Sequence, residues 1–107
     1  MKIMKRSGVE AQFDRSKIEA AVRKANQATD GAPELTEAQI CAIAADIEAD
    51  CQRMGRAPSV EEVQELVETG IMEADAFETA KRYIRYRYNH NLMREANTTD
   101  NQILSLI

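Results

Sequence analysis

The sequence predicts a mainly α-helical (α+β) domain, in which a short N-terminal β-hairpin forms a lid over one end of a four-helix bundle. Apolar residues recur every three or four positions in four successive segments, which is the period of an amphipathic helix. Only residues 2–13 alternate in the manner of β-strands. The 107 residues include four glycines and two prolines, so few positions interrupt a helix. This length fits one small domain with a modest core.

The N-terminal residues are expected to form the hairpin. The strands are predicted over Lys2–Arg6 and Val9–Phe13, and the Ser-Gly pair between them is a favourable two-residue turn. Because side chains alternate across a strand, Ile3 and Lys5 share one face. An isolated two-stranded hairpin is only marginally stable in water, so we expect this one to pack on the helices.

Four helices are predicted after the hairpin, at residues 15–28, 37–54, 60–73 and 76–95. Each carries an apolar stripe that would face the other helices. The stripe residues are Ile18, Ala21, Val22 and Ala25; Ile40, Ile43, Ile47, Cys51 and Met54; Val60, Val63, Leu66, Val67 and Ile71; and Phe77, Ala80, Ile84, Tyr88 and Leu92.

The helix starts carry capping signals. Asp14 is the expected N-cap of the first helix, since its short side chain can accept hydrogen bonds from free backbone N–H groups. Each later helix begins with a capping box, in which a Ser, Thr or Asp is followed three positions later by Gln or Glu. The pairs are Thr36 with Gln39, Ser59 with Glu62, and Asp75 with Glu78.

Charge is unevenly distributed along the chain, whose net charge is −4. Residues 1–24 hold seven Lys or Arg against three acids, residues 25–80 hold two against thirteen, and residues 81–107 hold five against two. If the basic ends meet in space, they form one positive patch on a negative protein. Such a patch suits a compact anion better than a nucleic acid, which the acidic middle would repel.

The composition does not support several other classes of site. Cys41 and Cys51 form no CxxC pair and the chain has one His, so no zinc site is expected and both thiols are interpreted as buried. No stretch approaches the roughly 18 apolar residues of a membrane span, and no signal peptide is recognised. No catalytic triad pattern and no GxxxxGK[ST] loop is present. We therefore expect a cytoplasmic, non-catalytic segment without nucleic-acid or membrane contacts and without metal-ligating side chains.

Lys5, Arg6 and Lys17 are the first candidate binding residues. Lys5 and Arg6 alone are compatible with a solvated hairpin tip, where charges are common. Lys17 favours a ligand, because a cation near a helix start opposes the helix dipole unless an anion binds there. Three such groups could surround one polyphosphate, with Ile3 as an apolar wall for a base beside it.

A second basic cluster lies in the last predicted helix, where Arg82, Arg85 and Arg87 occur within six residues. These cations repel one another unless a ligand or an acidic neighbour relieves them, and the acidic third helix could do so as easily as a ligand. The neighbouring tyrosines are equally compatible with a core face from which the arginines extend to solvent. His90 is expected to be partly exposed.

The segment Ile3–Val22, IMKRSGVEAQFDRSKIEAAV, resembles the opening of the ATP-cone, the allosteric nucleotide-binding domain of ribonucleotide reductases. SVEEVQELVETGIM and AKRYIRYRYNHNLMRE resemble the third and last helices of that family. The resemblance implies an ATP-cone at residues 1–95, with residues 96–107 as a linker and the start of a catalytic domain. The last residues, REANTTDNQILSLI, resemble the join between the cone and the catalytic barrel in anaerobic (class III) ribonucleoside-triphosphate reductases.

The resemblance implies that ATP activates and dATP inhibits the parent oxidoreductase through one site, usually with Mg²⁺. It assigns the phosphates to Lys5, Arg6, Lys17, Arg87 and His90. It assigns the adenine and ribose pocket to Ile3, Phe13, Asp14, Ile18, Val60, Val63 and Gln64. The implied partners are the nucleotide, the catalytic domain of the same chain and further copies of the parent enzyme.

Two alternatives stay open. The same cone also heads many aerobic class I large subunits, although the C-terminal residues argue against that parent. A different possibility is a helical protein-interaction module whose basic patch docks an acidic partner. Nucleotide titration would separate this module from an ATP-cone.

Overall fold

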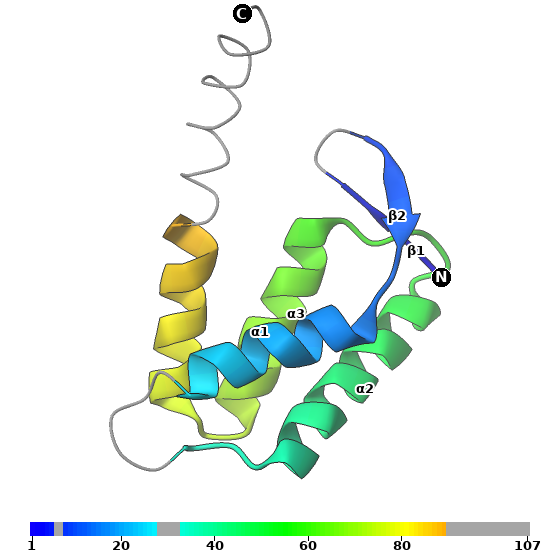
Figure 1. Cartoon of the computed structure of the whole chain (residues 1–107). Helices are drawn as coiled ribbons and strands as arrows, with labels where there is room; N and C mark the ends of the chain where they lie inside the picture. The colour runs from blue at the N-terminus through cyan, green and yellow to red at the C-terminus, as the bar shows by residue number, and fades with distance from the viewer. Residues whose placement is uncertain (6–7, 28–32, 90–107) are drawn as a thin grey trace, which may run out of the picture.

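The computed structural model describes residues 1–5, 8–27 and 33–89. Figure 1 shows a two-stranded antiparallel hairpin at one end of the helices, with α1 crossing in front of α3. The elements in chain order are β1 (Lys2–Met4), β2 (Glu10–Gln12), α1 (Arg15–Gln27), α2 (Glu37–Arg53), α3 (Val60–Glu73) and a fourth helix whose described part covers 77–89. The predicted fold class, mainly α with four helices behind an N-terminal hairpin, is confirmed.

The hairpin is tied to the helices along the outer edge of β1. The two strands pair with Ile3 opposite Ala11, and Gly8 takes a φ of 83°, a left-handed conformation that glycine adopts without steric penalty. On the other edge of β1, Met4 donates its N–H to the Pro58 carbonyl at 2.8 Å. The strands are shorter than predicted, but this edge bond supplies the packing that an isolated hairpin lacks.

The first three helices begin at their predicted caps. The Asp14 carboxylate accepts a hydrogen bond from the Ser16 N–H at 3.0 Å, at the start of α1. At α2 the Thr36 hydroxyl accepts from the Gln39 N–H, while the Gln39 side chain accepts from the Thr36 N–H. The same reciprocal pair of bonds is present at the start of α3. Both capping boxes are therefore confirmed.

The start of the fourth helix corrects a prediction. Asp75 has a φ of 60°, which is not the extended conformation of an N-cap, and its N–H donates to the Met72 carbonyl at 2.9 Å. The cap is instead the Glu34 carboxylate, which precedes α2. It accepts hydrogen bonds from the Thr79 N–H at 2.6 Å and from the Thr79 hydroxyl at 2.8 Å. Because Glu34 and Thr79 are 45 positions apart, no local spacing could have indicated this cap.

The core is built from the predicted stripes of α1, α2 and α3, and its most completely buried side chains include Val22, Ile40 and Ile71. Cys51 is buried as predicted, and burial raises the pKa of its thiol. The prediction that Cys41 is buried is wrong, because this residue lies one position off the buried stripe of α2 and is exposed. No helix of the described residues is long and apolar enough to cross a membrane.

The fourth helix presents a different face to the core from the predicted one. Ala80 is buried as expected, and its buried companions are Ala76, Thr79 and Tyr83. The predicted stripe residues Phe77, Ile84 and Tyr88 are exposed, and Leu92 lies outside the described residues. The helix is thus turned by about one residue, roughly 100°, from the predicted orientation. Polar contacts explain the turn, because Thr79 is held by Glu34 and Arg87 is held by Glu68 of α3.

Candidate functional site

The cations of the described residues fall into two groups. The cations of one group each have a carboxylate within ion-pair distance. Most of them are arginines: Arg15, Arg23, Arg53, Arg56 and Arg87. The other group has no such carboxylate among the described residues and includes Lys5, Lys17, Lys24 and Arg82. An anionic ligand gains most from the second group, because no carboxylate competes with it.

Lys5 and Lys17 belong to the hairpin and to the helix that follows it. The Lys5 backbone closes the hairpin, since its N–H donates to the Val9 carbonyl and its carbonyl accepts from the Gly8 N–H, both at 2.9 Å. Its side chain is exposed. Lys17 is also exposed and lies in the first turns of α1, where the first turn contains no acidic residue. Neither ammonium group has an ion-pair partner among the described residues, so both are available to a ligand.

Asp14 stands beside Lys17 in the chain but does not pair with it. The hydroxyl of Ser16 donates to the Asp14 carboxylate and is the main reason that its pKa lies below the usual value. The Ser16 N–H and the Lys17 charge lower this pKa further. The carboxylate is thus ionised and fixed as the cap of α1, at the entrance to the helix end where an anion would bind.

Most of the apolar residues assigned to the base pocket belong to the hydrophobic core or pack against it. Phe13, Ile18 and Val63 are buried in the same hydrophobic cluster, and Ile3 packs against it. Val60 is half-buried at the start of α3. Phe13, Ile18 and Val63 are therefore core residues, whereas Ile3 and Val60 keep surface with which a ligand could make contact.

Gln64 has an unsatisfied polar atom. Its side-chain Oε1 is buried and has no hydrogen-bond partner among the described residues. It lies in the second turn of α3, whose preceding residue Ser59 forms a parallel bridge with Met4 of β1. An unpaired buried amide oxygen costs about 1–3 kcal/mol, so a ligand that donates a hydrogen bond here would be stabilised.

Arg87, a predicted phosphate residue of the last helix, is paired within the protein. Arg87 pairs with Glu68 of α3 at 2.8 Å, and the two side chains are 18% and 19% exposed. The positive charge of Arg87 is therefore balanced by the acidic third helix and not by a ligand. Burial, with Glu68 nearby, raises the pKa of Tyr83 to about 12. Arg6 and His90 lie outside the described residues.

A cavity between α1 and the fourth helix brings in cations that sequence reasoning did not assign to a site. It has a volume of about 140 Å³ and is lined by Ala21, Lys24, Ala25, Arg82 and Tyr86. The Lys24 ammonium lies 5.6 Å from the centroid of the Tyr86 ring, and the buried Arg82 Nε has no hydrogen-bond partner among the described residues. The signal was present in the sequence, because Lys17, Ala21 and Lys24 are spaced to share one face of α1.

Comparison with known proteins connects this arrangement to a family. A family model described as the ATP cone domain matches residues 1–92. The chain belongs to the ATP-cone family. ATP-cones are regulatory domains of ribonucleotide reductases that bind ATP or dATP as effectors, so the resemblance found in the sequence is confirmed.

Two kinds of reductase contain a segment similar to this ATP-cone. The chain is 31% identical to the ribonucleoside-diphosphate reductase subunit alpha of Chlamydia muridarum, with 97% of the chain covered. It is 28% identical to the anaerobic ribonucleoside-triphosphate reductase of Escherichia coli, with 94% covered. The chain spans only 11% and 14% of the lengths of these relatives. The similar identities do not separate the two kinds of reductase.

Proposed function

We propose that this ATP-cone binds ATP and dATP at one site between the hairpin, α1 and α3, and so regulates a ribonucleotide reductase. The observation that carries the proposal is that Lys5 and Lys17 have no ion-pair partner among the described residues, where five arginines do have one. With Arg6 they would hold the triphosphate through charge-assisted hydrogen bonds. Mg²⁺ would enter with the phosphates, since it is commonly bound through phosphate oxygens.

The adenine would lie against Ile3 and Val60, with its amino group near Gln64. Two observations support this placement: the buried Gln64 oxygen lacks a donor, and the apolar cluster lies beneath the hairpin residue Ile3. Lys24 and Arg82 extend the cationic face of α1 toward the fourth helix and would strengthen binding through longer-range attraction.

Regulation requires that the two effectors favour different arrangements of the parent enzyme. A ligand shifts an equilibrium only through its different affinities for the two states. We propose that ATP activates and dATP inhibits, and that the missing ribose hydroxyl changes how the hairpin packs over the helices. Asp14, fixed at the start of α1, is the acidic residue among those assigned to the adenine and ribose pocket.

We propose an anaerobic, cytoplasmic ribonucleoside-triphosphate reductase as the parent enzyme. The support is the segment Arg94–Ile107, which resembles the join to an anaerobic catalytic barrel and lies outside the described residues. An aerobic class I parent is the alternative, because a ribonucleoside-diphosphate reductase subunit matches the chain at 31% identity, against 28% for an anaerobic reductase. Reading the gene beyond Ile107 tests this point. A glycyl-radical motif with CxxC pairs would support the anaerobic parent, and their absence would contradict it.

Calorimetric titration of the 107-residue chain with ATP and with dATP, in the presence of Mg²⁺, tests the binding site. Both nucleotides should bind, and each should raise the melting temperature. The double variant Lys5→Ala with Lys17→Ala should lose binding, since each charge-assisted contact is worth about 1.5–3 kcal/mol.

A matched control removes two cations that the structure pairs on the helix surfaces, through Arg23→Ala with Arg53→Ala. This variant should bind as tightly as the original chain. If millimolar nucleotide gives neither heat nor stabilisation, the protein-interaction module becomes the better explanation. If both variants lose affinity equally, the binding site is not at the hairpin.

A further inference from the structure

The fourth helix exposes an apolar face flanked by cations. Phe77 and Tyr88 are 58% and 63% exposed, and Ile84 between them is 38% exposed. These residues and Lys81 are spaced at i, i+4, i+7 and i+11, so they form one stripe, with Arg85 along its edge. We call these five residues the outer face of the fourth helix. An exposed apolar stripe of this kind, rimmed by charge, is typical of an interaction surface.

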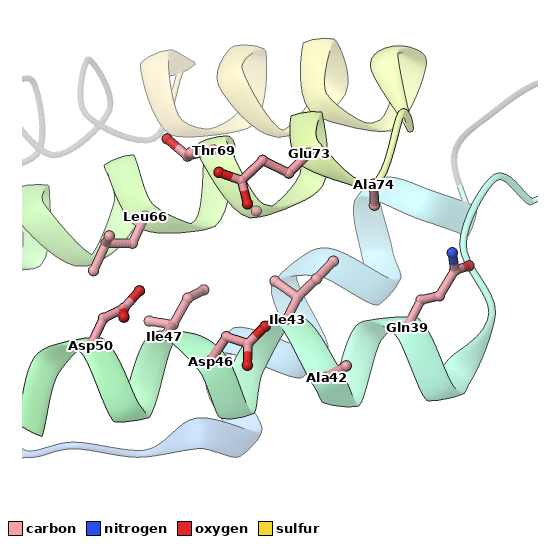
Figure 2. A pocket seen from close by; sticks show the side chains of 11 residues that line it. Gln39, Ala42, Ile43, Asp46, Ile47, Asp50, Leu66, Thr69, Glu73 and Ala74 are labelled. Atoms are coloured by element: carbon pink, nitrogen blue, oxygen red, sulfur yellow. The ribbon is translucent and has the colours of Figure 1, made fainter.

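A groove with the complementary character lies between α2 and α3. It has a volume of about 280 Å³, and its apolar lining includes Ile43, Ile47 and Leu66. Figure 2 shows Asp46 and Asp50 on α2, facing the helix that carries Glu73. We call this surface the acidic groove. Its acids make it a poor site for the nucleotide, which would be repelled.

The carboxylates of the acidic groove can still form ion pairs with basic residues of a partner. Asp50 forms an ion pair with Arg53, but Asp46 and Glu73 have no ion-pair partner among the described residues. Gly70 lets α3 approach α2 closely at the groove, because a Cβ there would lie only 3.0 Å from Ile43 Cγ2. A larger side chain at this position would press on the groove lining.

The outer face and the acidic groove match each other in both charge and polarity. Lys81 and Arg85 can meet unpaired carboxylates, while Phe77 and Ile84 can cover the apolar lining of the groove. Lys81 already lies 3.5 Å from Glu78, but this pair is solvent-exposed and can be exchanged at little cost. The two surfaces cannot meet within one copy, since the fourth helix uses Tyr83 and Arg87 to pack on the same α3 that forms one wall of the groove.

We infer that two copies of this chain associate, with the outer face of the fourth helix of one copy docked in the acidic groove of the other. The two contacting surfaces are different, so the contact is heterologous and either closes into a ring or extends. The contact involves neither Lys5 nor Lys17, and it therefore does not depend on the proposed nucleotide site.

Sedimentation velocity of the 107-residue chain over a range of concentrations tests the association. The weight-average sedimentation coefficient should rise with concentration at low salt and rise less at about 0.5 M salt, because exposed charge pairs are screened. A chain that stays monomeric at all concentrations, with or without salt, would overturn the inference and leave the outer face to a different partner.

Charge reversal identifies the two surfaces separately. The first variant, Lys81→Glu with Arg85→Glu, changes the outer face, and the second, Asp46→Lys with Glu73→Lys, changes the groove. All four residues are exposed, so each variant should keep the helical circular dichroism of the original chain. Each variant alone should associate at least about tenfold more weakly, since like charges then face each other.

Mixing the two variants is the decisive step. An acidic outer face then meets a basic groove, and the unaltered surfaces of the two variants also match, so association should return to the original level. If the groove variant alone associates normally, the outer faces pair with each other and the inference is wrong. If the mixture stays as weak as its components, the groove is not the docking site.

Discussion

The α2–α3 pair and the part formed by the hairpin, α1 and the fourth helix are stabilised in different ways. α2 and α3 begin with their own capping boxes, and Arg56 makes two bonds to the α3 cap residue Glu62, at 2.9 and 2.6 Å. The fourth helix instead depends on Glu34 from a distant segment, and the hairpin depends on the backbone of Pro58. The first part is a locally specified scaffold. In the second part α1 has its own local cap, Asp14, but the hairpin and the fourth helix are held by long-range contacts.

The cations differ between the two parts as well. Arg53 and Arg56, on and next to the scaffold, are ion-paired. The second part holds both kinds: Arg15, Arg23 and Arg87 are ion-paired, whereas Lys5, Lys17, Lys24 and Arg82 have no carboxylate within ion-pair distance among the described residues. A part that is held by a few distant contacts and carries unpaired charge can respond to a ligand. We therefore expect the hairpin, α1 and the fourth helix to respond to the nucleotide, while α2 and α3 support them.

The largest expected effect comes from truncating the scaffold core. Ile71 is completely buried in α3, so Ile71→Ala should lower the free energy of unfolding by about 2–5 kcal/mol. Urea denaturation followed by circular dichroism measures the change. The control is the neighbouring Met72→Ala, which is 41% exposed and should change stability by less than about 0.5 kcal/mol. Equal losses in the two variants would contradict the position of α3 at the centre of the core.

A smaller and more local effect is expected at the long-range cap. Glu34→Ala removes the acceptor for the Thr79 N–H and hydroxyl, and a lost helix cap costs about 1 kcal/mol. Amide hydrogen exchange should increase in the fourth helix more than in α2 and α3. Asp75→Asn is the control, because Asn tolerates the left-handed backbone of this position and no capping bond is lost. If both variants destabilise the fourth helix equally, Asp75 contributes to the cap and Glu34 is not its main acceptor.

The smallest expected effect is a pH dependence at the scaffold cap. The Arg56 guanidinium, with the Ser59 N–H, lowers the pKa of Glu62 from 4.5 to about 2. Because the pKa is lower in the folded state, this contribution to stability is complete above pH 4.5 and is lost as the pH falls toward about 2. The melting temperature should therefore decrease over this range less steeply in Glu62→Gln than in the original chain. A matched change on the exposed surface of α3, Glu65→Gln, should leave the steepness unaltered.

Local sequence signals were sufficient where a structure depends on neighbouring residues. The hairpin turn, the starts of α1, α2 and α3 and the buried stripes of these helices follow from spacing and capping chemistry. The candidate cations Lys5 and Lys17 were also found in this way, because a charge that opposes its own helix end is visible in the sequence. The buried face of the fourth helix could not be predicted from these local signals, since Phe77 and Tyr83 are similar in size and hydrophobicity.

The sequence by itself determined the elements, their order and the family, because turn residues, caps and periodic apolar residues act over a few positions. The tertiary structure alone decided which face of the fourth helix is buried, that Glu34 caps it and that Arg87 pairs with Glu68. It also decided that the Gln64 oxygen has no hydrogen-bond partner within the described part of the chain. The physical reason is distance along the chain. Each of these features depends on a contact, or on the lack of one, between side chains that only packing can bring together.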